Sequence, residues 1–421
     1  MERYVIRGGK KLSGKVQIQS AKNSVLPMIA GAVLCSEDVV IKNCPKIKDV
    51  LVMLEIISAL GCSYKFDNKD LVINAKEMNS FIVPSALASE LRSSVFMLGA
   101  LVSRFKKAVL NYPGGCKIGK RPIDLHILAL EKLGINTSVN QDEINCTADK
   151  ISGGEVYLQY PSVGATENLM LASVFASGKT QIHNAAKEPE IVDLMRFLNS
   201  MGAKIYGAGT STILIEGVSR LHGTEHVAIP DRIEQGTFLL ATLISGGEVE
   251  LHNCNAKNIS FLIHKFCNNT CNISINSDII YIKSGGSLKS FSFCTGPYPS
   301  FPTDLQAQTM ALLSVSMGQS VVTENVFENR FNHVGELVKM GADIRISKKR
   351  AFITGVSRLH GAEVDAHDLR GGASLVLAGL NAEGQSVINN VQHIERGYYQ
   401  FDKKLLSLGA DIKKENFRRD I

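Results

Sequence analysis

The sequence has 421 residues, 45% hydrophobic and 20% charged, a composition typical of a globular protein. Its formal net charge of +6 is small for this length, so it permits an anionic small-molecule substrate but does not indicate nucleic-acid binding. No window of about eighteen uninterrupted apolar residues occurs, so no membrane-spanning helix is predicted. A chain this long is expected to form two or more lobes.

An apolar segment that ends in a Leu-Gly or Met-Gly step recurs along the chain. The steps lie at 60–61, 133–134, 201–202, 340–341 and 408–409, about 70 residues apart with one double gap. The gap contains HKFCNNTCNIS near residue 270, a degenerate copy. Because glycine closes a helix in the left-handed conformation, the spacing predicts six units, each with a helix that ends at this step.

Each unit also opens with a polar step before an apolar helix. The openings are Lys22-Asn23, Arg92, Ser162–Gly164, Asp231-Arg232, Asp304 and Asp368–Arg370. Short alternating segments between the helices predict strands, among them 181–184, 203–206, 249–252, 320–324 and 342–346. A first strand at 4–7 has no partner in its own unit and is expected to complete the last one. We predict an N-terminal lobe of residues 21–229 and a C-terminal lobe of residues 1–20 and 230–421.

The predicted helix openings share a second property, a cation at or near the first helical residue. Lys22, Arg92 and Arg370 stand at matching places, and Arg232 is displaced by one residue. Equivalent helices of repeated units tend to pack in parallel, so their unpaired N–H groups would face the same way. Such a surface is suited to anions. The alternative is that these residues are ordinary caps and surface charges.

Residues 112–126 read YPGGCKIGKRPIDLH and combine one thiol with three cations and three glycines. Proline and glycine cannot continue a helix here, so Cys116 is predicted to lie on a loop. A thiol beside cations is a better nucleophile or proton donor, and the same cations would hold a phosphate or carboxylate. The alternative is an ordinary cysteine on a solvated loop. The apolar run 127–133 that follows predicts a helix.

The nine cysteines as a set show no disulfide framework. An odd, unpatterned set indicates reduced thiols, so we expect a cytoplasmic protein. Cys267 and Cys271 lie four positions apart, but no second pair with ligand spacing lies nearby, so no metal site is predicted. The absence of Trp also argues against platforms that stack nucleic-acid bases.

Several of these segments together resemble the UDP-N-acetylglucosamine 1-carboxyvinyltransferases, the MurA-type enolpyruvyl transferases of bacterial peptidoglycan synthesis. The segments are SAKNSVLP at 20–27, PGGCKIGKRPIDLH at 113–126, PSVGATEN at 161–168, FPTDLQAQ at 301–308, ENVFENRFNHV at 324–334, DLRGGASLVLAG at 368–379 and HIERGY at 393–398. They span essentially the whole chain. The resemblance implies an α/β fold, a two-lobed inside-out α/β barrel built from six βαβαββ repeats.

The resemblance also implies a reaction. Phosphoenolpyruvate and UDP-N-acetylglucosamine would give the enolpyruvyl ether at the sugar 3′-hydroxyl and phosphate, through a tetrahedral ketal, without a metal or cofactor. Cys116 is implied as the general acid, which can also carry a covalent phosphoenolpyruvate adduct, and Asp304 as the base. Lys22 and Arg396 are implied as further catalytic groups. No nucleic acid, membrane or obligatory protein partner is implied.

The resemblance assigns binding roles residue by residue. Phosphoenolpyruvate would contact Lys22, Asn23, Arg121 and Arg396. UDP-N-acetylglucosamine would contact Arg92, Arg121, Pro122, Ile123, Asp124, Leu125, Ser162, Val163, Gly164, Asp304 and Val326. Supporting roles are implied for Arg330, Asp368 and Arg370. The sequence departs from the family pattern in three places. Tyr160 stands where some members carry a basic residue, Phe96 stands where some members have Trp, and the fourth unit carries the degenerate CNNTCN.

Three other interpretations are weighed against this one. The enolpyruvyl transferase of the shikimate pathway shares the repeat and uses phosphoenolpyruvate, but it lacks the cysteine-bearing PGGC loop. A non-catalytic paralogue that only binds the nucleotide sugar would be expected to lack part of the set Cys116, Asp304 and Arg396, and all three are present. A related RNA 3′-end cyclase uses a similar repeat, but its histidine motif has no clear counterpart here.

Overall fold

The structure is a computed structural model that describes residues 2–114, 123–266 and 271–417. These residues divide into two compact units. The N-terminal unit comprises residues 20–114 and 123–229, and the C-terminal unit comprises residues 2–19, 230–266 and 271–417. The chain passes from one unit to the other at 19–20 and at 229–230.

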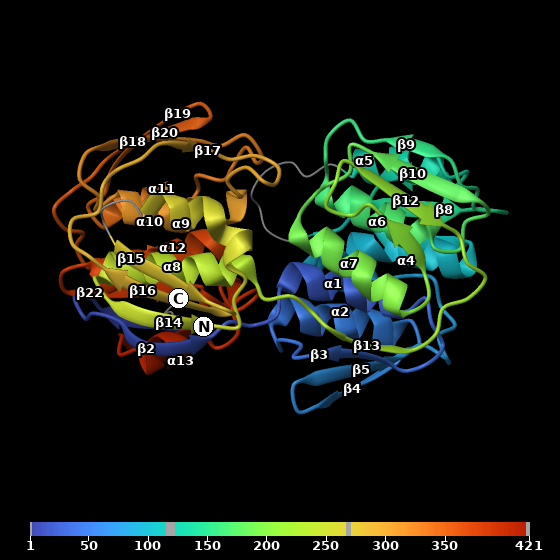
Figure 1. Cartoon of the computed structure of the whole chain (residues 1–421), viewed down its shortest axis with the longest axis horizontal. Coiled ribbons are helices and arrows are strands. Elements are labelled where there is room, and N and C mark those ends of the chain that lie inside the picture. Colours follow the sequence, from blue (N-terminus) through green and yellow to red (C-terminus); the bar gives the residue numbers. More distant parts are fainter. Residues whose placement is uncertain (1, 115–122, 267–270, 418–421) are drawn as a thin grey trace. The chain divides into compact units, whose positions relative to one another are not determined.

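The described part of the N-terminal unit contains three mixed or antiparallel sheets (Figure 1). Their strand orders are β13(Thr224–Val227)-β3(Val39–Lys42)-β5(Asp70–Asn74)-β4(Ser63–Asp67), β6(Lys107–Asn111)-β8(Glu143–Thr147)-β7(Asn136–Asn140) and β11(Lys204–Tyr206)-β12(Thr212–Glu216)-β10(Lys179–His183)-β9(Glu155–Tyr157). In two of these sheets, one edge strand pairs in parallel and the other pairs are antiparallel. The predicted strands at 181–184 and 203–206 are confirmed with bounds shifted by one or two residues.

The described part of the C-terminal unit also contains three sheets. Their strand orders are β21(Glu363–Asp365)-β22(Gln385–Asn389)-β1(Glu2–Arg7)-β23(Asp411–Asn416), β15(Cys271–Asn276)-β16(Ile279–Ser284)-β14(Glu248–His252)-β2(Ser13–Gln17) and β17(Phe293–Cys294)-β18(Gln319–Thr323)-β20(Arg350–Thr354)-β19(Asp343–Ser347). Strand β1 pairs antiparallel with both β22 and β23, so the prediction that the first strand completes the last unit is confirmed.

The helices of each unit lie between its sheets (Figure 1). The N-terminal unit contains α1(Lys22–Ala32), α2(Lys48–Ala59), α3(Ser85–Glu90), η1(Arg92–Val95), α4(Phe96–Phe105), α5(Asp124–Glu131), α6(Val163–Ser173) and α7(Pro189–Ser200). The C-terminal unit contains α8(Arg232–Ser245), η2(Ala256–Ile259), α9(Ser260–Phe266), η3(Thr303–Leu305), α10(Gln306–Leu313), α11(Val334–Lys339), α12(Leu369–Asn381), η4(Val391–His393) and α13(Phe401–Ser407).

Three helices form the centre of each unit, and they are the helices predicted from the six openings. Helices α1, α4 and α6 contact one another in the N-terminal unit, as do α8, α10 and α12 in the C-terminal unit. Almost every residue of these helices is buried. Helices that are apolar on all sides require burial on all sides, which explains why the sheets lie outside them. In the C-terminal unit this packing brings the first turn of α12 to η3, the short helix before α10, where Arg370 contacts Asp304.

The glycines of the repeated Leu-Gly and Met-Gly steps follow the second helix of a unit. Gly61, Gly134, Gly202, Gly341 and Gly409 all have positive φ, between 78° and 99°. The repeat prediction is therefore confirmed at these positions, because each backbone adopts the left-handed conformation that glycine reaches without strain. The degenerate copy at residues 267–270 lies outside the described residues.

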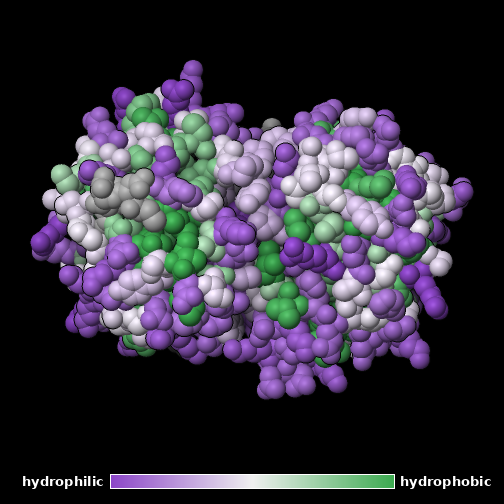
Figure 2. Space-filling view, viewed as in Figure 1, coloured by the Kyte–Doolittle hydropathy of each residue, from purple (hydrophilic) through white to green (hydrophobic). Residues whose placement is uncertain are grey.

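Hydrophilic residues cover most of the visible face, with small groups of hydrophobic residues between them (Figure 2). None of the helices in the described ranges is long and apolar enough to cross a membrane.

Candidate active site

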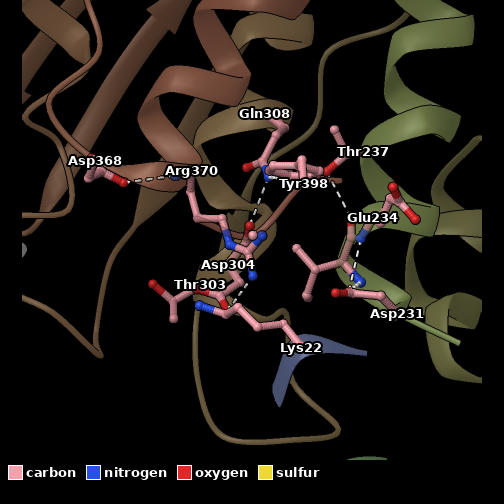
Figure 3. Close-up of polar contacts among 12 residues, drawn as sticks. Lys22, Asp231, Glu234, Thr237, Thr303, Asp304, Gln308, Asp368, Arg370 and Tyr398 are labelled. Atoms are coloured by element: carbon pink, nitrogen blue, oxygen red, sulfur yellow. Dashed lines mark hydrogen bonds and ion pairs between the residues drawn. The ribbon is translucent and has the colours of Figure 1, made fainter. Parts of the chain in front are cut away.

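Asp304 occupies the first turn ahead of α10, in the short helix η3. Arg330 Nη2 donates to its Oδ1 at 2.6 Å, and Arg370 Nη2 donates to its Oδ2 at 3.2 Å. The Asp304 side chain is 29% exposed, whereas those of Arg330 and Arg370 are 3% and 4% exposed. The carboxylate thus reaches solvent while two buried guanidiniums hold both of its oxygens (Figure 3 shows Asp304 and Arg370). This arrangement favours the ionised carboxylate.

Arg370 is the first-turn cation of α12 that the sequence predicted near a helix opening. Burial lowers the pKa of the Arg370 guanidinium, but the charge and hydrogen bond of Asp304, together with Tyr398 and Asp231, raise it by more, so the net shift is upward. Arg370 therefore stays charged at every relevant pH. A buried charge of this kind is tolerated only when it is paired.

Asp368 is the N-cap of α12. Its Oδ1 accepts from the backbone N–H groups of Arg370 at 2.9 Å and Gly371 at 3.1 Å. The same oxygen lies 3.9 Å from Arg330 Nη1. The cap bonds satisfy two of the N–H groups that a helix start leaves unpaired. Asp368 therefore fixes the start of α12, and with it the backbone from which Arg370 reaches Asp304.

His333 contacts the backbone of Arg330. Burial lowers the pKa of His333 to about 4, so the ring is neutral at physiological pH. Its Nδ1 lies 3.1 Å from the Arg330 carbonyl oxygen, which can only accept, so the proton of the neutral ring belongs on Nδ1. The imidazole thereby donates a hydrogen bond to the backbone of Arg330 and adds no second positive charge beside the guanidinium.

Glu324 connects Asp304 to another predicted contact residue. Its Oε1 accepts from the backbone N–H of Val326 at 2.8 Å, and its Oε2 accepts from the Thr303 hydroxyl at 3.0 Å. Glu324 is 3% exposed, so these bonds compensate the burial of its charge. The segment that carries Val326 is thus tied to the residue before Asp304. Sequence reasoning missed Glu324, which only opens a motif in the printed chain.

In the N-terminal unit, Lys22 is the first residue of α1 and forms an ion pair with Asp49 of α2. Lys22 Nζ lies 2.9 Å from Asp49 Oδ2, and the side chains are 13% and 6% exposed. A pair this buried has a fixed geometry, so Asp49 orients the ammonium group. Sequence reasoning missed Asp49, because nothing in its local pattern places it beside α1.

The first turn of α6 is the other predicted binding segment of this unit. Ser162 is the N-cap, and its hydroxyl accepts from the Ala165 N–H at 3.3 Å. A Cβ at Gly164 would lie 3.0 Å from the His126 ring, so a side chain there would press on the imidazole. Gly164 therefore lets α5 approach α6 closely.

Asn168 fixes the orientation of His126. Asn168 Oδ1 accepts from the Gly99 N–H at 2.7 Å, so its Nδ2 is the donor to the Val95 carbonyl at 2.9 Å and to His126 Nδ1 at 3.0 Å. The neutral ring therefore carries its proton on Nε2, next to Gly164. This polar chain joins α4, α5 and α6 and defines the surface beside the α6 N-terminus.

The other predicted residues lie as follows. Asn23 is in α1, Arg92 begins η1, Ile123 precedes α5, Asp124 and Leu125 are in its first turn, and Arg396 lies between η4 and α13. Helix α5 begins at Asp124, three residues before the predicted start. The predicted residues Cys116, Arg121 and Pro122 lie outside the described residues.

The clusters within each unit are polar but carry no metal-binding set. Within residues 2–114, 123–266 and 271–417, no three His, Cys, Asp or Glu side chains are placed to hold a metal ion together. The chemistry available to the C-terminal unit's cluster is that of an ionised carboxylate between fixed cations. Such a group can accept a proton from a hydroxyl.

Comparison with known proteins decides the family. The model of the family described as EPSP synthase (3-phosphoshikimate 1-carboxyvinyltransferase) matches residues 6–405. UDP-N-acetylglucosamine 1-carboxyvinyltransferase 2 of Caldanaerobacter subterraneus subsp. tengcongensis is 48% identical, over 98% of this chain and 99% of its own. The chain belongs to the UDP-N-acetylglucosamine 1-carboxyvinyltransferase family. The relative of the same description from Carboxydothermus hydrogenoformans is 47% identical over 98% of this chain and 99% of its own.

Solved structures agree in fold. The enolpyruvyl transferase NikO from Streptomyces tendae has a TM-score of 0.89 at 24% identity, over 98% of both chains. EPSP synthase from Acinetobacter baumannii has a TM-score of 0.74 at 19% identity, over 99% of this chain and 100% of that one. The predicted α/β enolpyruvyl transferase fold is therefore confirmed for this member of the family.

Proposed function

We propose that this chain transfers the enolpyruvyl group of phosphoenolpyruvate to the 3′-hydroxyl of UDP-N-acetylglucosamine and releases phosphate, the first committed step of peptidoglycan synthesis. The observation that carries the proposal is the 48% identity over nearly the full length of a relative with that name. The Asp304 cluster supports it, because a carboxylate held in its ionised form is the base that such a reaction requires.

In the proposed reaction, the Cys116 thiol gives its proton to the methylene carbon of phosphoenolpyruvate. The 3′-oxygen of the sugar bonds to C2 while its proton passes to Asp304, and a tetrahedral ketal results. The C2–O bond to phosphate then breaks, phosphate leaves with the bonding electron pair and the proton held by Asp304, and the methyl carbon returns a proton to the Cys116 thiolate, which restores the double bond. Atoms and charges balance without a metal, a redox step or a second co-reactant. A covalent phosphoenolpyruvate adduct on Cys116 belongs to the same proposal.

The cations have distinct proposed roles. Lys22, oriented by Asp49, would hold phosphoenolpyruvate together with Asn23, Arg121 and Arg396, since the substrate carries both a phosphate and a carboxylate. Arg330 and Arg370 instead hold Asp304, so their proposed role is to keep the base ionised and oriented.

The nucleotide sugar has its own proposed contacts. The first turn of α6, at Ser162 to Gly164, presents backbone N–H groups suited to a phosphate oxygen of UDP-N-acetylglucosamine. Arg92, Arg121 to Leu125, Val326 and Asp304 complete the proposed set. Tyr160 lies two residues before the α6 N-cap, where some relatives are expected to place a cation, and its hydroxyl would provide a neutral contact instead.

We infer that each unit is an inside-out barrel of three βαβαββ repeats, the two lobes predicted from the sequence. Three central helices and three outer sheets in the described part of each unit support this inference. We also propose that the protein works in the cytoplasm without a metal, a cofactor or an obligatory protein partner.

The proposed function is tested by the mass of the product. The protein is incubated with phosphoenolpyruvate and UDP-N-acetylglucosamine, or with the analogue that lacks the 3′-hydroxyl. The expected product has the mass of the nucleotide sugar plus one enolpyruvyl group, and the analogue should give none. Unchanged nucleotide sugar, or equal modification of the analogue, would overturn the proposed reaction or its position.

A further inference from the structure

A chain of buried hydrogen bonds in the C-terminal unit leads from Asp304 to helix α8. Gln308 Nε2 lies 3.0 Å from the Asp304 carbonyl oxygen and 3.1 Å from the Tyr398 hydroxyl. The Tyr398 hydroxyl lies 2.9 Å from Thr237 Oγ1 (Figure 3), and Thr237 donates to the Ile233 carbonyl at 2.7 Å. Gln308, Tyr398 and Thr237 are almost completely buried.

The carbonyl oxygens at the two ends of this chain of hydrogen bonds determine which groups donate. The Asp304 carbonyl can only accept, so the Gln308 amide must turn its NH₂ toward it and toward Tyr398. The Ile233 carbonyl likewise requires the Thr237 hydroxyl to donate. Tyr398 therefore donates to Thr237, and the second N–H of Gln308 is directed toward both hydroxyl oxygens, 3.1 Å from that of Tyr398 and 3.2 Å from Thr237 Oγ1. Because each hydroxyl proton is assigned, the directions of the Tyr398–Thr237 and Thr237–Ile233 bonds are fixed, and Tyr398 lies between Gln308 and Thr237.

The ring of Tyr398 faces the Arg370 guanidinium. The guanidinium carbon lies 5.5 Å from the ring centroid, within the range of a cation–π interaction. Arg370 also holds Asp304 Oδ2, so Tyr398 lies beside the guanidinium and is linked through Gln308 to the Asp304 backbone (Figure 3). Burial raises the pKa of Tyr398, so the phenol stays protonated and can donate to Thr237.

The backbone on both sides of Tyr398 is fixed as well. Gln19 Nε2 donates to the Gly397 carbonyl at 2.8 Å, and Gln19 Oε1 accepts from the Tyr399 N–H at 2.9 Å. The side-chain amide of Gln19 therefore bonds the backbone of both residues that flank Tyr398. The backbone that carries the ring is therefore held by contacts other than the one with Arg370.

We propose that Tyr398 is a positioning residue of the transfer reaction, which orients Arg370 through its ring and Asp304 through its hydroxyl and Gln308. This inference rests on the proposed function, in which Asp304 accepts the proton of the 3′-hydroxyl. A base must lie within hydrogen-bond reach of the proton that it takes, and a loosened Arg370 would both displace the carboxylate and weaken the charge that keeps it ionised. The loss should appear in turnover rather than in substrate binding.

The test compares Tyr398→Phe, which removes the hydroxyl and keeps the ring, with Tyr398→Leu, which removes both. A lost buried hydrogen bond should lower kcat about threefold, and loss of the ring as well should lower it about tenfold or more. KM for UDP-N-acetylglucosamine should stay within about twofold. The acidic limb of the kcat profile should move to higher pH in Tyr398→Leu, because Asp304 then takes up a proton more readily. The matched control is Tyr399→Phe, whose hydroxyl accepts only from Gln400 among the described contacts.

A crystal structure of Tyr398→Leu gives a readout that needs no activity. We expect the Arg370 guanidinium to leave hydrogen-bonding distance of Asp304 Oδ2. Three results would overturn the inference. The Arg370 guanidinium could keep its position, the acidic limb of the kcat profile could stay at the same pH in a folded and active variant, or the effect could be confined to KM. If the unsubstituted protein releases no phosphate, the proposed function fails by itself, and the position of Arg370 still decides the inference. If Tyr398→Leu does not fold, the Tyr398→Phe variant decides: kcat equal to that of Tyr399→Phe would count against the positioning role.

Discussion

The substitution Asp304→Asn removes the carboxylate charge and keeps the shape of the side chain. Without an ionised oxygen the residue cannot accept the proton of the 3′-hydroxyl, and loss of a general base lowers turnover by about 10²–10⁴-fold. The binding of UDP-N-acetylglucosamine should change far less, since an amide oxygen still offers a hydrogen-bond acceptor. We therefore expect the loss in kcat, with KM altered by less than about threefold.

The same substitution should lower the free energy of unfolding, and the exposure and contacts of Asp304 limit by how much. Breaking a fully buried ion pair by removing one partner costs about 3–5 kcal/mol. Asp304 is 29% exposed, and Arg330 keeps a second carboxylate, that of Asp368, at 3.9 Å. Solvent and this remaining charge reduce the cost, so the free energy of unfolding should fall by about 1–2 kcal/mol.

Phosphate release and urea denaturation measure the two effects separately. The matched control is Asp343→Asn, an exposed carboxylate at the start of β19 in the same unit, which should change neither quantity. A folded Asp304→Asn variant with kcat within threefold of the unsubstituted protein would refute the role of base. A large loss of stability with normal turnover would show that the two guanidiniums serve the fold alone.

Three further predictions concern ionisable side chains that are buried or nearly buried. Lys22→Gln should lower kcat/KM for phosphoenolpyruvate about 10–100-fold, because a charge-assisted contact is lost, and unchanged steady-state kinetics would contradict the assigned role. Burial, Glu190 and Glu188 raise the pKa of Glu167, so its contribution to stability is present at low pH and lost as the pH rises. In urea titrations between pH 5 and pH 8, the free energy of unfolding of Glu167→Gln should rise relative to that of the unsubstituted protein. A difference in the free energy of unfolding that stays constant over this pH range would contradict the prediction. Burial lowers the pKa of His333 to about 4, so below about pH 6.5 the unfolded chain binds a proton that the folded protein does not, and stability falls by up to about 3 kcal/mol. The fall of the free energy of unfolding with decreasing pH should be smaller in His333→Asn. An equal fall in the two proteins would rule out His333 as its source.

The repeated architecture could be predicted because its signals are local. A glycine such as Gly202 or Gly341 marks a helix end by itself, since its left-handed backbone is a property of one residue. The apolar helices that follow each polar opening are equally local. The place of the first strand, β1, could be inferred because it has no partner in its own unit, and β1 lies between β22 and β23.

The supporting residues of the site could not be predicted, because their roles arise from tertiary packing. Asp49 meets Lys22 across 27 positions, and Tyr398 meets Thr237 across 161. Asp49 looks like an ordinary residue in the printed chain, and Tyr398 ends the recognisable HIERGY motif, which gives no sign of its hydrogen-bond partners. Glu324 stands at the edge of a recognisable motif, but its pairing with Thr303 depends on the fold of β18 beside η3. Family resemblance names the groups that touch substrate, whereas these positions follow from the packing of helices.

The most direct test of the proposed function is phosphate release from phosphoenolpyruvate with two alternative acceptors, UDP-N-acetylglucosamine and shikimate 3-phosphate, in the unsubstituted protein and in Cys116→Ala. We predict release with the nucleotide sugar only, and its loss in the substituted protein. Release with shikimate 3-phosphate would assign the chain to the other branch of enolpyruvyl transferases. Tight binding of UDP-N-acetylglucosamine without any release would contradict catalysis and indicate a protein that only binds the nucleotide sugar.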